Sequence, residues 1–159
     1  MPVYTAQQHF NDAEDYKKKG LLQEAIESYK KAIDADDSFV SAYYNLALLY
    51  YQTQQLSQAI VNLKKVTDLD PGDVSACNNL GVLYVAMGRR NDAKRCFEKA
   101  LAGDTNYGEA RINLEKIQQK LRNAQSPSSP LQTTGISRGK KKLNIGFVSV
   151  WFERGQAYV

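Results

Sequence analysis

Four asparagines recur along this 159-residue sequence at intervals of 34 residues: Asn11, Asn45, Asn79 and Asn113. A side-chain amide carries both a hydrogen-bond donor and an acceptor, as a peptide backbone does. A row of such amides can therefore pair with the backbone of an extended peptide, whatever the sequence of that peptide. Asparagine can equally serve packing by bonding the neighbouring backbone, and the sequence leaves both roles open.

Residue types that perform catalysis or hold metals lack the spacing that either chemistry needs. Cys77 and Cys96 stand in no metal-binding motif, and we interpret them as buried free thiols. His9 is the only histidine, and we expect it to pack rather than to act in catalysis. The acidic residues cluster in predicted turns, where we expect them to cap helices: Asp34, Asp36, Asp37, Asp68, Asp70 and Asp73. The sequence therefore predicts no catalytic residue, no metal and no cofactor.

The same interval of 34 residues governs the apolar positions, and it divides the chain into the units 6–39, 40–73 and 74–107. Small residues stand at the eighth and twentieth positions of each unit: Ala13, Ala47, Gly81, Ala25, Ala59 and Ala93. Large residues stand at the eleventh and twenty-fourth positions: Tyr16, Tyr50, Tyr84, Tyr29, Leu63 and Phe97. Small residues let two helices approach closely, while large ones fill the space beside the contact. Each unit is therefore predicted to be a pair of packed helices.

This pattern resembles the tetratricopeptide repeat family over residues 6–107, although the tryptophan usual at the fourth position is missing. The resemblance implies an all-α fold, a right-handed superhelix of three helix-turn-helix repeats. Residues 108–122 carry an apolar stripe at helical spacing, which predicts a capping helix that covers the last unit. Gly20 and Gly88 suit the left-handed turn after the first helix of their units, whereas Gln54 suits it less well.

The resemblance also implies that the first helix of each unit lines a concave groove. The residues expected to bind a peptide there are Asn11, Asn45, Asn79, Asn113, Tyr44, Leu48, Tyr51, Asn78 and Val82. The amides resemble the asparagine ladder of the O-GlcNAc transferase superhelix, and the apolar middle suits a peptide with apolar anchors. Burial of Val82 and Val85 against a neighbouring helix is the alternative. Phe10, Glu14 and Ser75 stand where family members that bind a terminal carboxylate have other residues, so we expect no such clamp.

The net positive charge of the chain lies outside the repeats. Residues 1–123 carry 16 basic and 16 acidic side chains, so the formal net charge of +4 belongs to residues 124–159. A basic face for phosphate is not supported, and we expect no nucleic-acid partner. No long apolar run and no secretory leader is present, so we expect no membrane partner and a cytoplasmic location.

The remaining sequence divides into two parts. Residues 123–142 are rich in Ser, Pro, Thr, Gln and Gly and predict a flexible linker. Residues 143–159, LNIGFVSVWFERGQAYV, contain one β-type segment and resemble the truncated start of a glycosyltransferase built of two Rossmann-like domains. The alternative is an apolar tail that packs on the repeats. Seventeen residues cannot complete an α/β domain, so we expect the chain itself to be non-catalytic.

These patterns favour a scaffold module that binds a protein or peptide in the concave groove, as the docking arm of a larger glycosyltransferase. The sequence leaves a second function open, which is self-association into a homo-oligomer through the groove or the tail.

Overall fold

The computed structural model describes residues 4–125, which form seven α-helices and, within this range, no strand. The helices are α1 (Ala6–Lys18), α2 (Leu22–Ala35), α3 (Val40–Gln52), α4 (Leu56–Leu69), α5 (Val74–Ala86), α6 (Arg90–Gly103) and α7 (Gly108–Gln125). Equivalent helices begin 34 residues apart, at residues 6, 40, 74 and 108. The predicted all-α array of helix pairs with a closing helix is confirmed.

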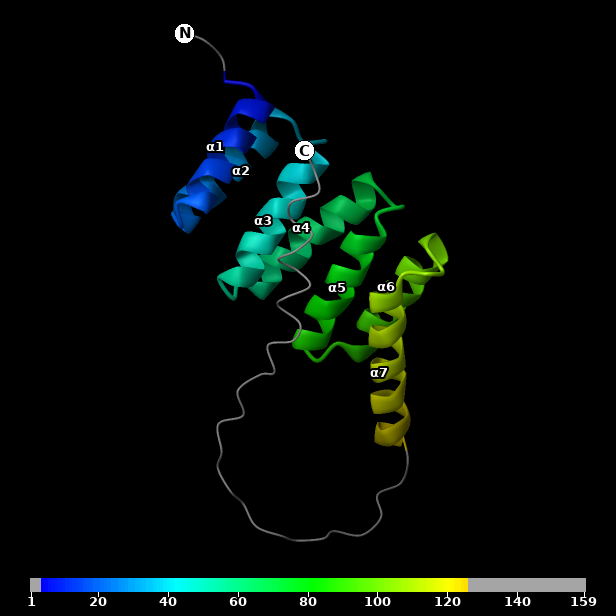
Figure 1. The fold of residues 1–159 in the computed structure, drawn as a ribbon. Helices are drawn as coiled ribbons and strands as arrows, with labels where there is room; N and C mark the ends of the chain where they lie inside the picture. The colour runs from blue at the N-terminus through cyan, green and yellow to red at the C-terminus, as the bar shows by residue number, and fades with distance from the viewer. Residues whose placement is uncertain (1–3, 126–159) are drawn as a thin grey trace, which may run out of the picture.

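Each helix packs against the next one in the sequence, and the pairs follow one another in a superhelical array (Figure 1). Helices α1, α3, α5 and α7 are the first helices of successive units. Among them, α7 also contacts α5 directly. The side of the array formed by these four helices is the one on which the sequence places the candidate binding residues.

Small residues bring the two helices of each pair together. Ala13, Ala25, Ala47, Ala59 and Ala93 are completely buried. Gly81 of α5 lies so close to α6 that a Cβ atom there would stand 2.5 Å from Cε1 of Phe97. The aromatic ring at the twenty-fourth position therefore occupies the space that the missing side chain leaves. The close approach predicted from the repeat pattern is present.

The turn after each first helix contains one residue in the left-handed conformation. Gly20 and Gly88 have φ angles of 75° and 73°, and Gln54 holds the equivalent place with a φ of 62°. A residue with a Cβ atom adopts this conformation at a cost of about 1–2 kcal/mol. The second unit therefore carries backbone strain that the first and third avoid.

The acidic turn residues perform two different tasks. The Asp73 carboxylate accepts a hydrogen bond from the Ala76 N–H and caps α5, as predicted. Asp36, Asp70 and Asp104 end the second helices, and each accepts a bond from the N–H two residues further on. These three bonds stabilise the turn between units rather than a helix N-terminus, which corrects the expectation of general capping.

Helix α7 covers the end of the third unit, with Ala110 and Ile117 buried. It continues to Gln125, past residue 122 where the sequence predicted its end, because Ala124 and Gln125 are good helix formers. The predicted linker beyond residue 125 and the glycosyltransferase-like residues 143–159 lie outside the described residues. Among the described helices, none has the length and apolar character needed to cross a bilayer.

Candidate functional site

The four asparagines, Asn11, Asn45, Asn79 and Asn113, lie on α1, α3, α5 and α7. We call the side of these four helices that carries the asparagines the ladder face. Asn11 is exposed and accepts a hydrogen bond from Gln7, while Asn45 is half-buried. Asn79 and Asn113 are both 8% exposed. The amides therefore differ in how much of each side chain a ligand can reach.

Two of the four amides join neighbouring units. The Asn79 Nδ2 donates to the Tyr44 hydroxyl at 2.8 Å, and the Asn113 Nδ2 donates to the Asn78 Oδ1 at 3.0 Å. In both cases the sixth residue of one unit bonds the fifth residue of the unit before it. Asn78 is only 3% exposed, so its bond with Asn113 is shielded from water. These two amides thus serve the packing of the repeats.

Asn45 departs from this arrangement because the fifth residue of the preceding unit is Phe10, which cannot accept a hydrogen bond. Its Nδ2 donates to the Ser41 carbonyl within α3 at 3.0 Å. Its Oδ1 accepts a long bond of 3.4 Å from the Lys17 Nζ on α1. Asn45 is therefore the half-buried amide at the middle of the ladder face that makes no bond to the fifth residue of the unit before it.

A charged cluster lies beside Asn45. The Lys17 Nζ pairs with the Glu14 carboxylate at 2.7 Å, and the Tyr29 hydroxyl donates to the same carboxylate. Burial, and then the hydrogen bond to Glu14, raise the pKa of Tyr29 far above its usual range. The Tyr29 hydroxyl consequently stays protonated and acts as a donor. Because Glu14 balances the charge of Lys17, the cluster presents little net charge to a ligand.

A row of partly apolar side chains lies to one side of Asn45 on α3. Tyr44, Leu48 and Tyr51 are half-buried, so part of each is exposed to solvent. Val82 of α5 is buried and packs into the core, whereas Val85, one turn further along, is exposed. The accessible apolar surface near the centre of the ladder face thus comes from α3, with Val85 and the 52% exposed Ile112 beyond it.

The sequence does not predict several of these contacts. It predicts that Tyr29 packs between helices, but not that its hydroxyl bonds Glu14, although a buried tyrosine hydroxyl usually has a hydrogen-bond partner. Asn78 was assigned to ligand binding, and the structure places it in the bond with Asn113. Cys77 is buried as expected, but Cys96 is half-buried, and both are free thiols. His9 is half-buried, with its ring 5.1 Å from that of Tyr4.

The described residues contain no group of three or more His, Cys, Asp or Glu side chains placed to hold a metal ion. What the ladder face offers is hydrogen bonding and apolar contact. Its amide at Asn45 can donate to or accept from a peptide backbone, while Tyr44, Leu48 and Tyr51 offer surface for apolar side chains.

Family models and solved structures match the chain. A model described as "TPR repeat" matches residues 13–54 and 48–88, and one described as "Tetratricopeptide repeat" matches residues 74–103. No curated protein sequence matches the chain.

Three solved structures share its fold. The first repeat domain of Spaghetti (RPAP3), bound to the HSP90 peptide SRMEEVD, is 27% identical with a TM-score of 0.68, over 74% of this chain and 93% of that one. A structure of MamA is 25% identical with a TM-score of 0.68, over 75% and 66%. The Sgt2 domain from Aspergillus fumigatus is 22% identical with a TM-score of 0.66, over 84% and 93%, a likeness that shows the fold alone.

Proposed function

Because the chain belongs to the tetratricopeptide repeat family, we propose that it is a scaffold module that binds a protein or peptide along the ladder face. The observation that carries the proposal is the arrangement on α3, where the half-buried Asn45 amide lies beside a row of three partly exposed side chains, Tyr44, Leu48 and Tyr51. A related array is described in complex with a peptide, which supports the same use of the fold here.

The ligand class follows from the charge and shape of the face. Tyr44, Leu48 and Tyr51 offer contact for two or more apolar anchors, and Asn45 offers pairing to the backbone between them. Lys17 is already paired with Glu14, so this end of the face supplies no uncompensated cation for an acidic group. An extended or helical peptide with apolar anchors is therefore the expected ligand. The other residues of the proposed binding site lie next to this centre on the ladder face: Asn11, Asn78, Asn79, Val82 and Asn113.

Selection of short random peptides on the full chain, followed by isothermal titration, tests this proposal. The selected peptides should share spaced apolar residues and should bind more tightly than SRMEEVD. Leu48→Ala should weaken binding because it removes apolar contact from the ladder face, whereas Val61→Ala on the exposed surface of α4 is the matched control. Equal losses in the two variants, or preferential binding of SRMEEVD, would reject the site or the ligand class.

We further propose that the module is the docking arm of a larger glycosyltransferase. The support is the resemblance of residues 143–159 to the first strand of such an enzyme, together with the asparagine ladder. The gene sequence that follows the codon for Val159 tests this directly. A continuing open reading frame with alternating strands and helices is expected, and a stop codon at that point in the gene would end the proposal.

Self-association is the second candidate function, and the exposure of Ile112 on the closing helix favours it. An apolar side chain that is 52% exposed on α7 can be covered by a second copy of the chain. Light scattering should then give a mass above that of one chain, and Ile112→Glu should restore the monomer. A monomer mass for the unaltered chain at high concentration would exclude this function.

A further inference from the structure

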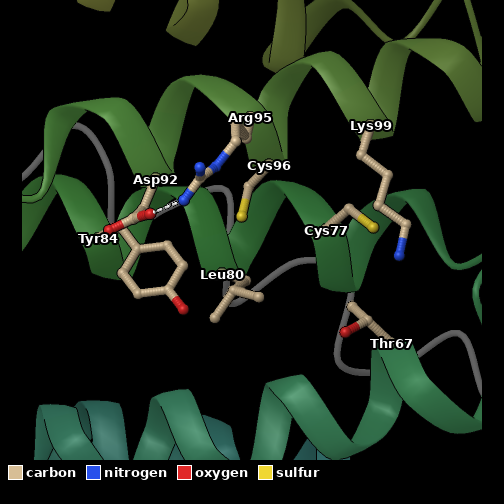
Figure 2. Close-up of a pocket in the computed structure, with 8 residues that line it drawn as sticks. All are labelled: Thr67, Cys77, Leu80, Tyr84, Asp92, Arg95, Cys96 and Lys99. Atoms are coloured by element: carbon tan, nitrogen blue, oxygen red, sulfur yellow. Dashed lines mark hydrogen bonds and ion pairs between the residues drawn. The ribbon is translucent and has the colours of Figure 1, made fainter.

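A pocket of about 230 Å³ lies between α4 and α6, with α5 at its floor (Figure 2). Its walls are formed by Thr67, Cys77, Leu80, Tyr84, Asp92, Arg95, Cys96 and Lys99. Cys77, Leu80 and Tyr84 follow one another on α5 at spacings of three and four residues, which places them on one side of the helix. Asn78, Asn79 and Val82 belong to the other side. The pocket therefore opens away from the ladder face.

The floor of this pocket is apolar. Leu80 and Tyr84 are almost fully buried, and the guanidinium of Arg89 lies 4.5 Å from the centre of the Tyr84 ring. Burial raises the pKa of the Cys96 thiol to about 11 and raises that of Cys77 as well. Both thiols are neutral at physiological pH, when they behave as small apolar side chains rather than as nucleophiles or metal ligands.

The volume limits what the pocket can hold. Sites for cofactors and drug-sized ligands enclose roughly 300–1,000 Å³. At about 230 Å³, this pocket falls below that range and has room for a single large side chain. Pockets of this kind, which receive one anchoring residue, are typical of the centres of protein interfaces.

Among the residues that line the pocket, two basic side chains, Arg95 and Lys99, stand against one acidic side chain, Asp92, while Asp70 and Asp73 lie near enough to act on Cys77. Arg95 and Arg89 both pair with Asp92, so that carboxylate already serves two cations. Lys99 extends from α6 beside Cys77 (Figure 2). Among residues 4–125 it has no ion-pair or hydrogen-bond partner. Helix α6 carries four basic residues against two acidic ones. A partner that brings a carboxylate to this rim would supply the counter-charge that Lys99 lacks.

We propose that the pocket is a second docking site, which takes one aromatic side chain of a partner protein while the acidic residue next to it pairs with Lys99. The ring would replace water against Leu80, Tyr84 and the two thiols, and it would be held between α4 and α6. Because the pocket and the ladder face lie on opposite sides of α5, both can be occupied at once. The module then joins two partners, one on each side.

The test uses the full chain and the peptide SGFEEGS, which has one aromatic residue followed by two acidic ones. Binding is followed by the backbone amide shifts of Leu80, Tyr84 and Cys96 in NMR spectra. Two control peptides remove one feature each: SGAEEGS lacks the ring, and SGFKKGS reverses the charge. Saturable shifts confined to the pocket are expected with SGFEEGS, and the two controls should bind much more weakly.

Two matched variants separate the rim contact from general attraction. Lys99→Glu should weaken binding of SGFEEGS about tenfold, because a charge-assisted contact becomes a repulsion. Arg90→Glu makes the same change of charge at an exposed place on α6 outside the pocket, and it should leave the affinity within about twofold. Asn45→Ala changes the ladder face and should leave the binding of SGFEEGS unchanged. The result for the pocket is therefore independent of whether the ladder face binds a peptide.

Three results would overturn the second docking site. Shifts that fall on Tyr44, Leu48 and Tyr51 instead would assign the peptide to the ladder face. Equal weakening by Lys99→Glu and Arg90→Glu would reduce the effect to overall charge. Shifts at the pocket that appear on raising the protein concentration, but not with SGFEEGS, would identify a second copy of the chain as the occupant.

Discussion

Replacing Asn113 by alanine removes the donor of the hydrogen bond that joins α7 to α5. The acceptor left behind, Oδ1 of Asn78, belongs to a residue that is 3% exposed, so water cannot easily take the place of the lost amide. A buried polar atom left without a partner costs about 1–3 kcal/mol. Native domains are stable by only about 5–15 kcal/mol, so the loss is a measurable share of the whole.

Urea unfolding of four proteins gives the assay: the unaltered chain, Asn113→Ala, Asn78→Ala and the double variant. Each single variant should lower the free energy of unfolding by about 1–3 kcal/mol. The double variant should lose less than the two singles added together, with a coupling of about 0.5–3 kcal/mol, because the second substitution removes the orphaned partner. This coupling measures the bond itself rather than the loss of two side chains.

A strictly additive double variant would refute the reasoning, since it would mean that the two amides do not depend on each other. An Asn113→Ala variant as stable as the unaltered chain would do the same. Either result would mean that the Asn113 amide is available for a ligand, and that it does not differ from the Asn45 amide in serving the packing of the repeats.

Two further predictions concern the turn of the second unit and the thiol of the pocket. Gln54→Gly should stabilise the chain by about 0.5–1 kcal/mol in urea unfolding, because glycine adopts a φ of 62° without strain. The control Gln58→Gly, inside α4, should destabilise the chain. A destabilised Gln54→Gly variant would show that the Gln54 side chain contributes more stability than the backbone strain costs. Iodoacetamide should modify Cys96 with a rate that rises from pH 9 to about pH 11, because the thiolate is the reactive form and burial raises the thiol pKa to about 11. A rate midpoint near the ordinary thiol pKa of about 8.5 would contradict that environment.

The helical architecture was accessible from the sequence because its signals repeat. Ala25, Ala59 and Ala93 mark the same contact three times, and each recurrence strengthens the interpretation of the others. The ends of individual helices were harder to predict from the sequence. The end of α7 lies at Gln125 rather than at residue 122, because the apolar stripe ends before the helix does. A stripe reports the buried side of a helix and not its full length.

The roles of the asparagines needed the structure. Whether an amide at the sixth position bonds the preceding unit depends on the residue at the fifth position of that unit. Tyr44 and Asn78 offer polar atoms there, whereas Phe10 does not. This signal is present in the sequence, but its meaning requires knowing that the two positions face each other. The pocket beside Lys99 has no local signal, since its walls come from three helices.

The affinity of a selected apolar-anchored peptide for Asn45→Ala, compared with Asn91→Ala, tests the central claim most directly. Asn91 is an exposed asparagine on α6 and serves as the matched control. If the Asn45 amide pairs with the peptide backbone, Asn45→Ala should weaken binding by about three- to tenfold, the equivalent of one neutral hydrogen bond, with little change in stability. Asn91→Ala should bind as the unaltered chain does. Unchanged affinity in Asn45→Ala would contradict the claim that this amide holds the ligand.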